Sequence, residues 1–360
     1  MSAPRTQAGA GPARAPARAP ASSGAASPPA SSDGPPLLRV EGLCCEFRTE
    51  GAVVRAVENV SFEIGRGRIV GVVGESGCGK SATALAILGL LPRPAGRIAA
   101  GSIQLDGREL VGLSERELTH VRGARVAMIF QDPMSSLNPY MKVGEQVAEV
   151  AEIHLGLRRE QARQRAVELL ARVRIPDAER RAEQYPHELS GGMRQRAMIA
   201  MALSCQPALV IADEPTTALD VTVQAQILEL LLELRRDKGL SLLLISHDLG
   251  VIASTSDEVL VMYAGRIVEQ APTRALLREP HHPYTRALLR SVPRADQRQR
   301  EPLATLPGLP PRLDRGPVRA CTFAPRCEHA VARCLEAEPA LDGTQPGRRR
   351  RCVLSPAELE

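Results

Sequence analysis

The chain has 360 residues, of which 44% are hydrophobic, so it can bury the core of one domain with appendages. Its formal net charge of +5 at pH 7 is mild, and we expect the dense basic run Arg348–Arg351 to be a solvated surface rather than a site for lipid or nucleic acid. No apolar run reaches the roughly 18 residues that a membrane-spanning helix needs, which excludes an integral membrane protein acting alone.

The chain begins with a segment of unusual composition. Residues 1–36 consist mainly of Ala, Pro, Ser and Gly, which predicts a disordered tail. This tail lacks the apolar centre of a secretory signal, so we expect the protein to stay in the cytoplasm. A β-rich stretch is predicted from Leu37 to about Ile69, and a helical insertion from about Val143 to Glu183 that ends near Pro186.

The first chemically informative segment is Gly74–Ser81, with the sequence Gly-Glu-Ser-Gly-Cys-Gly-Lys-Ser. It follows a predicted strand at Ile69–Val73 and precedes a predicted helix at 82–90, the context that a phosphate-binding loop requires. Its glycines allow backbone amides to converge on a polyphosphate at a helix N-terminus. We expect Lys80 to reach the β- and γ-phosphates and Ser81 to complete a Mg²⁺ shell. The alternative is a chance glycine-rich turn. The residues predicted to hold the nucleotide here are Gly74, Glu75, Ser76, Gly77, Cys78, Gly79, Lys80, Ser81 and Ala82.

The second segment, Leu209–Pro215, is an apolar run that ends in two carboxylates. A buried parallel strand would place Asp213 and Glu214 at its carboxyl end, where open α/β sheets bind their ligands. We expect Asp213 to help hold Mg²⁺ through water and Glu214 to act as the base that activates the attacking water. The alternative is a strand that ends in a solvated acidic turn.

Between these segments lies Leu189–Arg196, and the order of all the motifs resembles that of the ATP-binding subunits of ABC (ATP-binding cassette) transporters. The resemblance implies that Ser190, Gly191 and Gly192 form the signature that binds the γ-phosphate of ATP held by an opposite subunit. Their position before a predicted helix at 193–203 makes them a plausible anion site in physical terms as well. Met193 stands where the family most often carries Gln, a departure that is common in the peptide-handling subgroup.

The same resemblance assigns four further positions. Gln131 matches the glutamine loop that senses Mg²⁺ and couples to the membrane subunits, and it is a candidate catalytic residue. Asp220 matches the loop between the two nucleotide sites. His247 matches the switch histidine, expected to contact the γ-phosphate and the region of Glu214. Phe47 resembles the aromatic residue that stacks on adenine, although a Phe after a short strand is commonly a core residue.

Three stretches resemble the first of the two ATPase subunits of dipeptide and oligopeptide importers: Arg122–Pro139, Thr216–Gln226 and His282–Leu289. This resemblance implies an ATPase that powers peptide uptake as a peripheral protein on the cytoplasmic face of the cell membrane. Its expected partners are a distinct second ATPase subunit, two transmembrane permease subunits and an extracellular peptide-binding protein, with no nucleic acid. The alternatives are a soluble ABC-type ATPase that acts on nucleic acid or the ribosome, and an exporter subunit.

Four of the eight cysteines lie near the end of the chain: Cys321, Cys327, Cys334 and Cys352. A cytoplasmic chain rarely keeps disulfides, so these residues are candidate metal ligands. Their spacing lacks the short hairpin that structural zinc prefers, and four thiolates can also hold an iron–sulfur cluster, whereas four free thiols are the plainer alternative. The resemblance to peptide-importer ATPase subunits implies a 4Fe–4S cluster.

Together these observations predict an α/β fold, the P-loop NTPase fold of ABC type. It would have a β-rich subdomain at its start, a helical subdomain that carries the signature, and a cysteine-containing appendage. The predicted domains are a tail at 1–36, an ABC ATPase domain at 37–280 with its helical subdomain at about 140–205, and a C-terminal region at 281–360. The expected cofactors are ATP, Mg²⁺ and a 4Fe–4S cluster.

Overall fold

The computed structural model describes residues 34–217, 219–292, 306–311, 313, 320–345 and 347–359. Residues 32–360 form one compact unit, and the fold described below is that of this unit. The predicted disordered tail at 1–36 falls outside the described residues, apart from its last three positions. Across the described ranges, no helix combines the length and the apolar character needed to cross a membrane.

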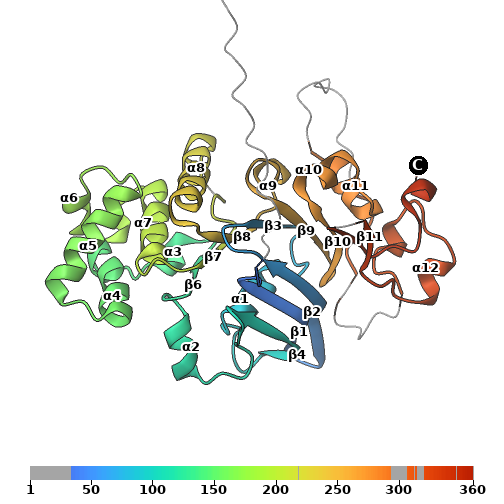
Figure 1. Ribbon diagram of the computed structural model, residues 1–360, viewed down its shortest axis with the longest axis horizontal. Helices are drawn as coiled ribbons and strands as arrows, with labels where there is room; N and C mark the ends of the chain where they lie inside the picture. Colours follow the sequence, from blue (N-terminus) through green and yellow to red (C-terminus); the bar gives the residue numbers. More distant parts are fainter. Residues whose placement is uncertain are drawn as a thin grey trace, which may run out of the picture. The chain divides into compact units, whose positions relative to one another are not determined.

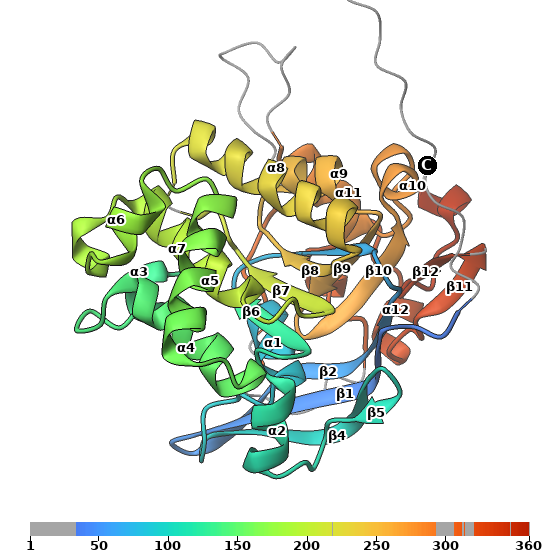
Figure 2. The same cartoon turned by 60° about the vertical axis from the view of Figure 1, so that its left-hand side comes forward.

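A central sheet carries the fold, with the strand order β11-β12-β10-β9-β3-β8-β7-β6 in the described ranges (Figures 1 and 2). Its parallel strands are β3 (Ile69–Val73), β6 (Val126–Ile129), β7 (Leu209–Asp213), β8 (Ser241–Ile245) and β9 (Glu258–Tyr263). The antiparallel extension consists of β10 (Arg266–Pro272), β11 (Asp342–Gln345) and β12 (Arg348–Arg350). The strand predicted at Ile69–Val73 and the strand predicted within Leu209–Pro215, which carries Asp213 at its carboxyl end, are confirmed.

The inner strands are buried on both faces, as apolar runs of parallel strands require. In β7, Val210 and Ala212 point into one hydrophobic core, whereas Leu209 and Ile211 point into another. The first core also contains the apolar faces of the helices that follow β6, and the second contains residues of the first two strands of the chain. Because both faces of β7 are covered, only its carboxyl end is left to present polar side chains.

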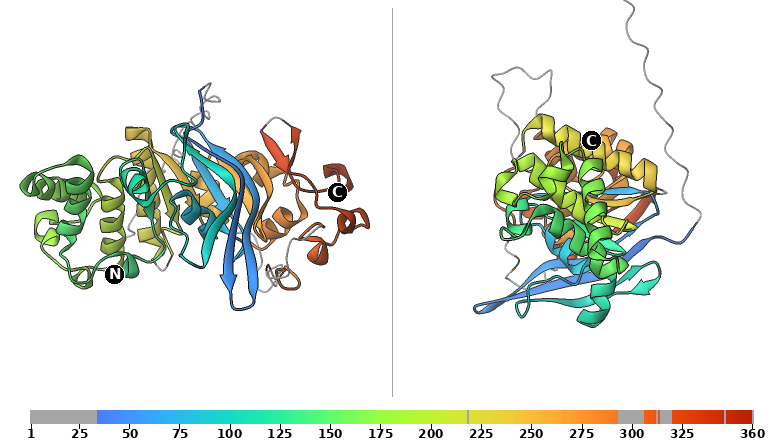
Figure 3. Two further views of the ribbon diagram at one scale, coloured as in Figure 1. Left: turned by 90° about the horizontal axis from the view of Figure 1, so that it is seen from below. Right: turned by 90° about the vertical axis from the view of Figure 1, so that its left-hand side faces the viewer.

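A separate antiparallel sheet has the order β2-β1-β4-β5 and lies across the central sheet in Figure 3. Its strands are β1 (Leu38–Thr49), β2 (Ala52–Ile64), β4 (Gly96–Leu105) and β5 (Arg108–Glu109). Helix α1 (Lys80–Ile87) shares the second core with this sheet and with β3. The β-rich start of the fold is therefore confirmed, and the helix predicted at 82–90 begins two residues earlier.

The predicted helical insertion is also observed, and its helices group beside β6 and β7 in Figure 1. Gly156 ends α4 with a left-handed backbone (φ 63°), the usual helix terminator. After α1, the helices of the described ranges are α2 (Glu115–Val121), α3 (Pro133–Ser136), α4 (Val143–Leu155), α5 (Arg159–Arg172), α6 (Ala178–Ala182), α7 (Gly191–Leu203), α8 (Val221–Lys238), α9 (Leu249–Thr255), α10 (Thr273–Arg278), α11 (Pro283–Arg290) and α12 (Arg333–Glu336). Short 3₁₀ turns are η1 (Pro186–Glu188), η2 (Ala324–Arg326) and η3 (Pro356–Leu359).

The basic run Arg348–Arg351 contradicts its prediction, because most of it is buried. Strand β12 pairs with β10, and the alternation of strand side chains turns Arg348 and Arg350 inward while the residue between them stays exposed. Arg348 lies 3.8 Å from the buried carboxylate of Glu269, and Arg351 lies 2.9 Å from Glu338. These arginines therefore join the C-terminal segment to the sheet instead of forming a basic patch.

Candidate nucleotide site

The loop between β3 and α1 has a shape that only glycine permits at two positions. A Cβ at Gly74 would lie 2.1 Å from the carbonyl oxygen of Met262, and a Cβ at Gly79 would lie 2.4 Å from that of Ala56. Both obstacles are backbone atoms of neighbouring strands, so they cannot move aside cheaply. Gly79 also has φ 107°, a region that favours glycine, and it is the N-cap residue directly before α1. The loop is therefore held tightly around the N-terminus of this helix.

Lys80 is the first residue of α1 and is buried. Its Nζ donates hydrogen bonds to the carbonyl oxygens of Gly74 at 2.8 Å and Glu75 at 3.0 Å. The ammonium group therefore lies inside the curve of the loop, where the predicted phosphates would bind. Cys78 is buried beside it, and burial raises the pKa of its thiol, which suits a small packing residue better than a nucleophile.

Asp213 and Ser81, both predicted Mg²⁺ ligands, meet at the end of β7. Burial raises the pKa of the Asp213 carboxyl, and the nearby Ser81 hydroxyl partly offsets this rise. One carboxylate oxygen of Asp213, Oδ1, is buried and has no hydrogen-bond partner among the described residues. A buried, unpaired carboxylate oxygen beside a hydroxyl is a donor set that suits Mg²⁺, because this cation prefers oxygen ligands. The residues present therefore fit the expected cation.

The next residue, Glu214, is the centre of a polar cluster. Its Oε2 accepts hydrogen bonds from Gln131 Nε2 at 3.0 Å and Thr217 Oγ1 at 3.0 Å, and lies 3.3 Å from Nδ1 of His247. The backbone of Glu214 has φ 48°, a left-handed conformation that is uncommon for a side chain of this size. Strained residues of this kind cluster at functional sites.

The structure thus brings together all three predicted catalytic residues: Gln131, Glu214 and His247. They come from the ends of three neighbouring strands, β6, β7 and β8. Sequence reasoning missed Thr217, although its place directly after Glu214-Pro215-Thr216 in the motif could have pointed to it. His247 is mostly exposed at 65%, so it can reach a ligand in front of the cluster.

The signature residues line a hollow of about 370 Å³. Ser190 caps α7 by accepting a hydrogen bond from the amide of Met193 at 3.3 Å, and Asp220 caps α8 by accepting one from Val223 at 2.9 Å. Two helix N-termini therefore open on one hollow, which favours an anion. Its lining residues are Ser190, Gly191, Gly192, Met193, Arg196, Leu219, Asp220 and Val223.

Apart from the signature hollow, a second hollow of about 410 Å³ adjoins the phosphate loop. It is lined by Val73 and by Gly74, Glu75 and Ser76 of the loop, by residues 247–249, and by Leu288, Ser291 and Val292 at the end of α11. None of its lining residues belongs to the signature hollow. The two hollows are separate, so the loop and the signature of one chain do not form a single pocket.

Phe47 lies inside β1 and not after a short strand as the sequence suggested. It pairs with Val54 and Gly96, is half-buried, and packs against the second core. Its ring lies 3.0 Å from where a Cβ on Gly96 would be. Phe47 is not among the residues lining either hollow. Its role in base stacking stays a prediction.

The four C-terminal cysteines are neighbours. The amide of Cys321 donates to the carbonyl of Cys334 at 2.9 Å. Burial, with smaller effects of the charges of the other three thiols, raises the pKa of Cys327 to about 11. In the described part of the chain, however, no three His, Cys, Asp or Glu side chains are arranged to hold a metal ion. The predicted 4Fe–4S cluster therefore finds no ready-made site in this structure.

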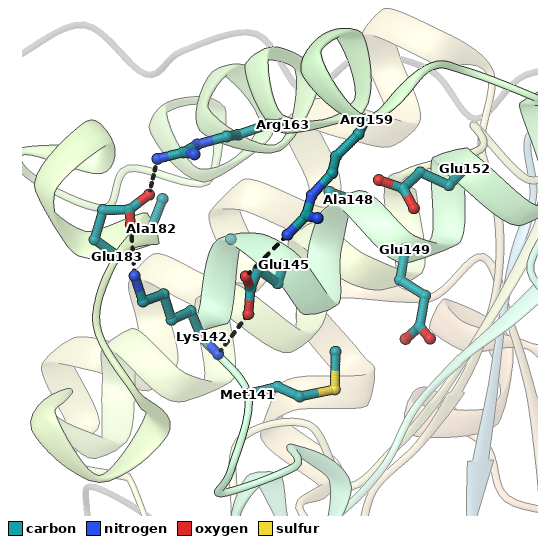
Figure 4. A pocket seen from close by; sticks show the side chains of 11 residues that line it. Met141, Lys142, Glu145, Ala148, Glu149, Glu152, Arg159, Arg163, Ala182 and Glu183 are labelled. Atoms are coloured by element: carbon teal, nitrogen blue, oxygen red, sulfur yellow. Dashed lines mark hydrogen bonds and ion pairs between the residues drawn. The ribbon is translucent and has the colours of Figure 1, made fainter.

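A further groove, of about 340 Å³, lies between α4, α5 and the end of α6 (Figure 4). Charged side chains from three helices face it and pair across it: Lys142 with Glu183 at 2.9 Å, and Arg159 with Glu145 at 3.7 Å. Tyr140, just before α4, is 90% exposed. The groove therefore has a charged wall, and the exposed Tyr140 directly precedes Met141, the first of its lining residues.

Comparisons with known proteins identify the family of the chain. A family model described as ABC transporter matches residues 57–217, and one described as Oligopeptide/dipeptide transporter, C-terminal region, matches residues 268–334. The chain is 52% identical over 319 residues to the probable peptide ABC transporter ATP-binding protein y4tR of Sinorhizobium fredii, covering 89% of this chain and 95% of that protein. This chain belongs to the peptide-importer family of ABC ATP-binding proteins. As an ABC ATPase, it hydrolyses ATP.

Two other relatives of this ABC ATP-binding protein are similarly close. It is 50% identical to the dipeptide transport ATP-binding protein DppD of Escherichia coli, over 88% of this chain and 96% of that protein. It is 51% identical to the oligopeptide transport ATP-binding protein OppD of Salmonella typhimurium, over 90% and 95%. Among solved structures, the dimeric ATP-binding cassette MJ0796 bound to ADP and Pi matches with a TM-score of 0.60 and 27% identity, over 66% of this chain and 99% of that one. The predicted family and cassette fold are confirmed.

Proposed function

We propose that this ABC ATPase drives the uptake of dipeptides or oligopeptides through partner permeases. The observation that carries the proposal is the Glu214 carboxylate, which is held by Gln131, Thr217 and His247 beside the phosphate loop. The peptide substrate is supported by the names of the relatives and by the C-terminal region that this chain shares with oligopeptide and dipeptide transporters. The Glu214 cluster supports ATP hydrolysis, whereas the relatives and the C-terminal region favour import of peptides over an exporter or a nucleic-acid ATPase.

Each residue of the site has a defined part in the proposed hydrolysis. The loop amides and Lys80 would bind the β- and γ-phosphates, while Ser81 and Asp213 would hold Mg²⁺. A bound Mg²⁺ would neutralise charge on the phosphate oxygens. Glu214 would accept the proton of the attacking water, and its hydrogen bonds to Gln131 and Thr217 keep the carboxylate oriented.

The separate hollows support a paired arrangement. Because the loop and the signature of one chain line different hollows, we infer that each ATP lies between the loop of one subunit and the signature of another. ATP would then close the pair and its hydrolysis would release it, since only the triphosphate reaches both surfaces. The dimer reported for the related cassette MJ0796 supports such pairing. We expect the companion here to be a distinct second ATPase subunit.

The groove beside α4 is the proposed contact for the permease. It lies on the helical part that would move with the signature, and its first lining residue, Met141, follows Gln131 in the chain. Its charges and the exposed Tyr140 suit a short cytoplasmic segment of a membrane subunit. The ATPase would therefore sit peripherally on the cytoplasmic face of the membrane. An extracellular binding protein would deliver the peptide to the two permeases.

The variant Glu214→Gln tests the catalytic assignment. Loss of a general base should slow ATP hydrolysis by about 10² to 10⁴, because the amide cannot accept the proton. In the presence of the companion subunit, an ATP-bound complex should accumulate and be visible by size-exclusion chromatography. The matched control is Glu229→Gln, which changes an exposed glutamate that pairs with Arg174 on the surface. Turnover by Glu214→Gln equal to that of the control would remove Glu214 from this role.

The 4Fe–4S cluster that the family resemblance implies needs its own test. Purification without oxygen should give brown protein that contains iron, because thiolates bound to iron absorb broadly in the visible range. Cys334→Ser should lose the colour and the iron, whereas Cys205→Ser, a cysteine outside the C-terminal region, should keep both. Colourless wild-type protein without iron would end this part of the proposal while leaving the ATPase assignment intact.

A further inference from the structure

A contact between the C-terminal region and the phosphate loop is not explained by the function proposed so far. Arg326, in η2, donates from Nη1 to Glu75 Oε2 at 2.8 Å and from Nη2 to Glu75 Oε1 at 2.9 Å. The two residues are separated by 251 positions in the sequence. A two-bond pair of this kind fixes direction as well as distance, because the planar guanidinium matches the carboxylate.

Arg326 is itself held firmly. Its side chain is only 5% exposed. Nη1 also donates to the hydroxyl of Tyr263 at 3.2 Å, Nε donates to the carbonyl of Pro307 at 2.8 Å, and the guanidinium lies 5.7 Å from the centre of the Tyr263 ring. The arginine therefore cannot follow Glu75 if the loop moves, so it acts as an anchor and not as a flexible surface partner.

A second residue of the C-terminal region holds the backbone of Glu75. The hydroxyl of Tyr284 accepts a hydrogen bond from the Glu75 amide at 2.9 Å. Tyr284 is fully buried, and its ring lies 4.6 Å from that of Tyr263 and 5.4 Å from that of Phe323. In a chain with four Phe, four Tyr and no Trp, this concentration of aromatic rings under one loop residue makes a rigid support.

Glu75 in turn contacts the lysine of the loop, because its carbonyl oxygen accepts a hydrogen bond from Lys80 Nζ at 3.0 Å. Glu75 is also the one acidic residue of Gly74–Ser81, and the guanidinium neutralises its charge where phosphates would approach. We propose that Arg326 is a positioning residue for ATP binding, which with Tyr284 fixes Glu75 so that the phosphate loop is preorganised and free of net repulsion. This inference rests on the role of the loop in binding ATP.

The test is steady-state ATP hydrolysis by the full chain with MgATP. Arg326→Ala should raise KM for ATP by roughly 10- to 100-fold, the usual effect of breaking a buried hydrogen bond to a charged group, and change kcat less. Adding Glu75→Gln to this variant should lower KM again, since the neutral amide removes the unpaired charge. The matched control is Arg290→Ala, which breaks an exposed ion pair between α11 and Glu328 and should leave KM unchanged.

Arg326→Lys covers the case in which the alanine variant does not fold. Lysine keeps the charge but cannot donate two parallel hydrogen bonds, so KM should rise by roughly 3- to 10-fold. A folded variant, shown by circular dichroism, that retains the wild-type KM would overturn the proposal, as would a Glu75→Gln change that adds to the defect instead of relieving it. Wild-type protein without ATP hydrolysis would instead refute the proposed function itself.

Discussion

Two glycines of the phosphate loop show how much stability an alanine would lose through steric crowding and how much through an unfavourable backbone conformation. Both Gly77 (φ 76°) and Gly79 (φ 107°) have positive φ. A Cβ at Gly77 would meet nothing within 4 Å, whereas one at Gly79 would lie 2.4 Å from the carbonyl oxygen of Ala56. Gly77→Ala should therefore lose about 1 to 2 kcal/mol of stability from conformation alone. Gly79→Ala should lose that amount and about 1 to 3 kcal/mol more from overpacking.

Thermal unfolding followed by circular dichroism, without nucleotide, measures this difference. Each 1 kcal/mol lowers Tm by about 2 to 4 °C in domains of 150–250 residues, so the two variants should be clearly separated. Gly79→Ala should also bind ATP more weakly, because the loop must shift to relieve the contact with β2. Equal losses of stability in the two variants would refute the reasoning, since only one of them meets a backbone atom.

Two further predictions concern charged residues of the site. Lys80→Ala should abolish tight ATP binding measured by isothermal titration calorimetry, because the phosphates lose their fixed positive charge; unchanged affinity would contradict the assignment of the loop. Asp213→Asn should stop Mg²⁺-dependent hydrolysis and, without nucleotide, gain stability relative to wild type as pH rises. Burial raises the pKa of Asp213 in the folded chain above its ordinary value of 3.8. The protonated acid therefore contributes its full share to the stability of the wild-type fold below pH 3.8, and this share is lost as pH rises through the folded-state pKa and the acid ionises. A difference in Tm between the two proteins that stays constant from pH 4 to pH 8 would count against this account.

Much of the catalytic site could be predicted because its residues lie in short motifs that follow strands. Glycine spacing predicts the phosphate loop, and an apolar run that ends in two carboxylates predicts a buried strand with acidic residues at its end. Parallel strands then bring their carboxyl ends to one edge of a sheet. This reasoning points to Glu214, whereas Gln131 and His247 were expected from resemblance to the ABC family; the structure brings the three side chains together, and their catalytic roles stay predictions. The sequence reasoning missed Thr217, whose hydroxyl reaches Glu214 through a turn that no periodic pattern predicts.

Other expectations failed or stayed open because they depended on what packs against a segment. A run of arginines looks solvated in sequence, yet β12 pairs with β10 and turns Arg348 and Arg350 into the interior. Phe47 was expected after a short strand, but pairing on both sides extends β1 through Thr49. The cysteines do come close together, but their spacing alone could not show whether the side chains are arranged to hold a metal.

The sequence by itself determined the order of strands, loop and helices around the nucleotide, since hydrophobic period, glycine and capping residues act over a few positions. Only the tertiary structure decided that Arg326 and Tyr284 would hold Glu75 from the far end of the chain. Such a contact depends on where α11 and η2 pack against the central sheet. The free energy that selects this packing comes from burial of side chains distant in sequence, such as Phe323 on Tyr263 and Tyr284, and no local pattern of residues records it.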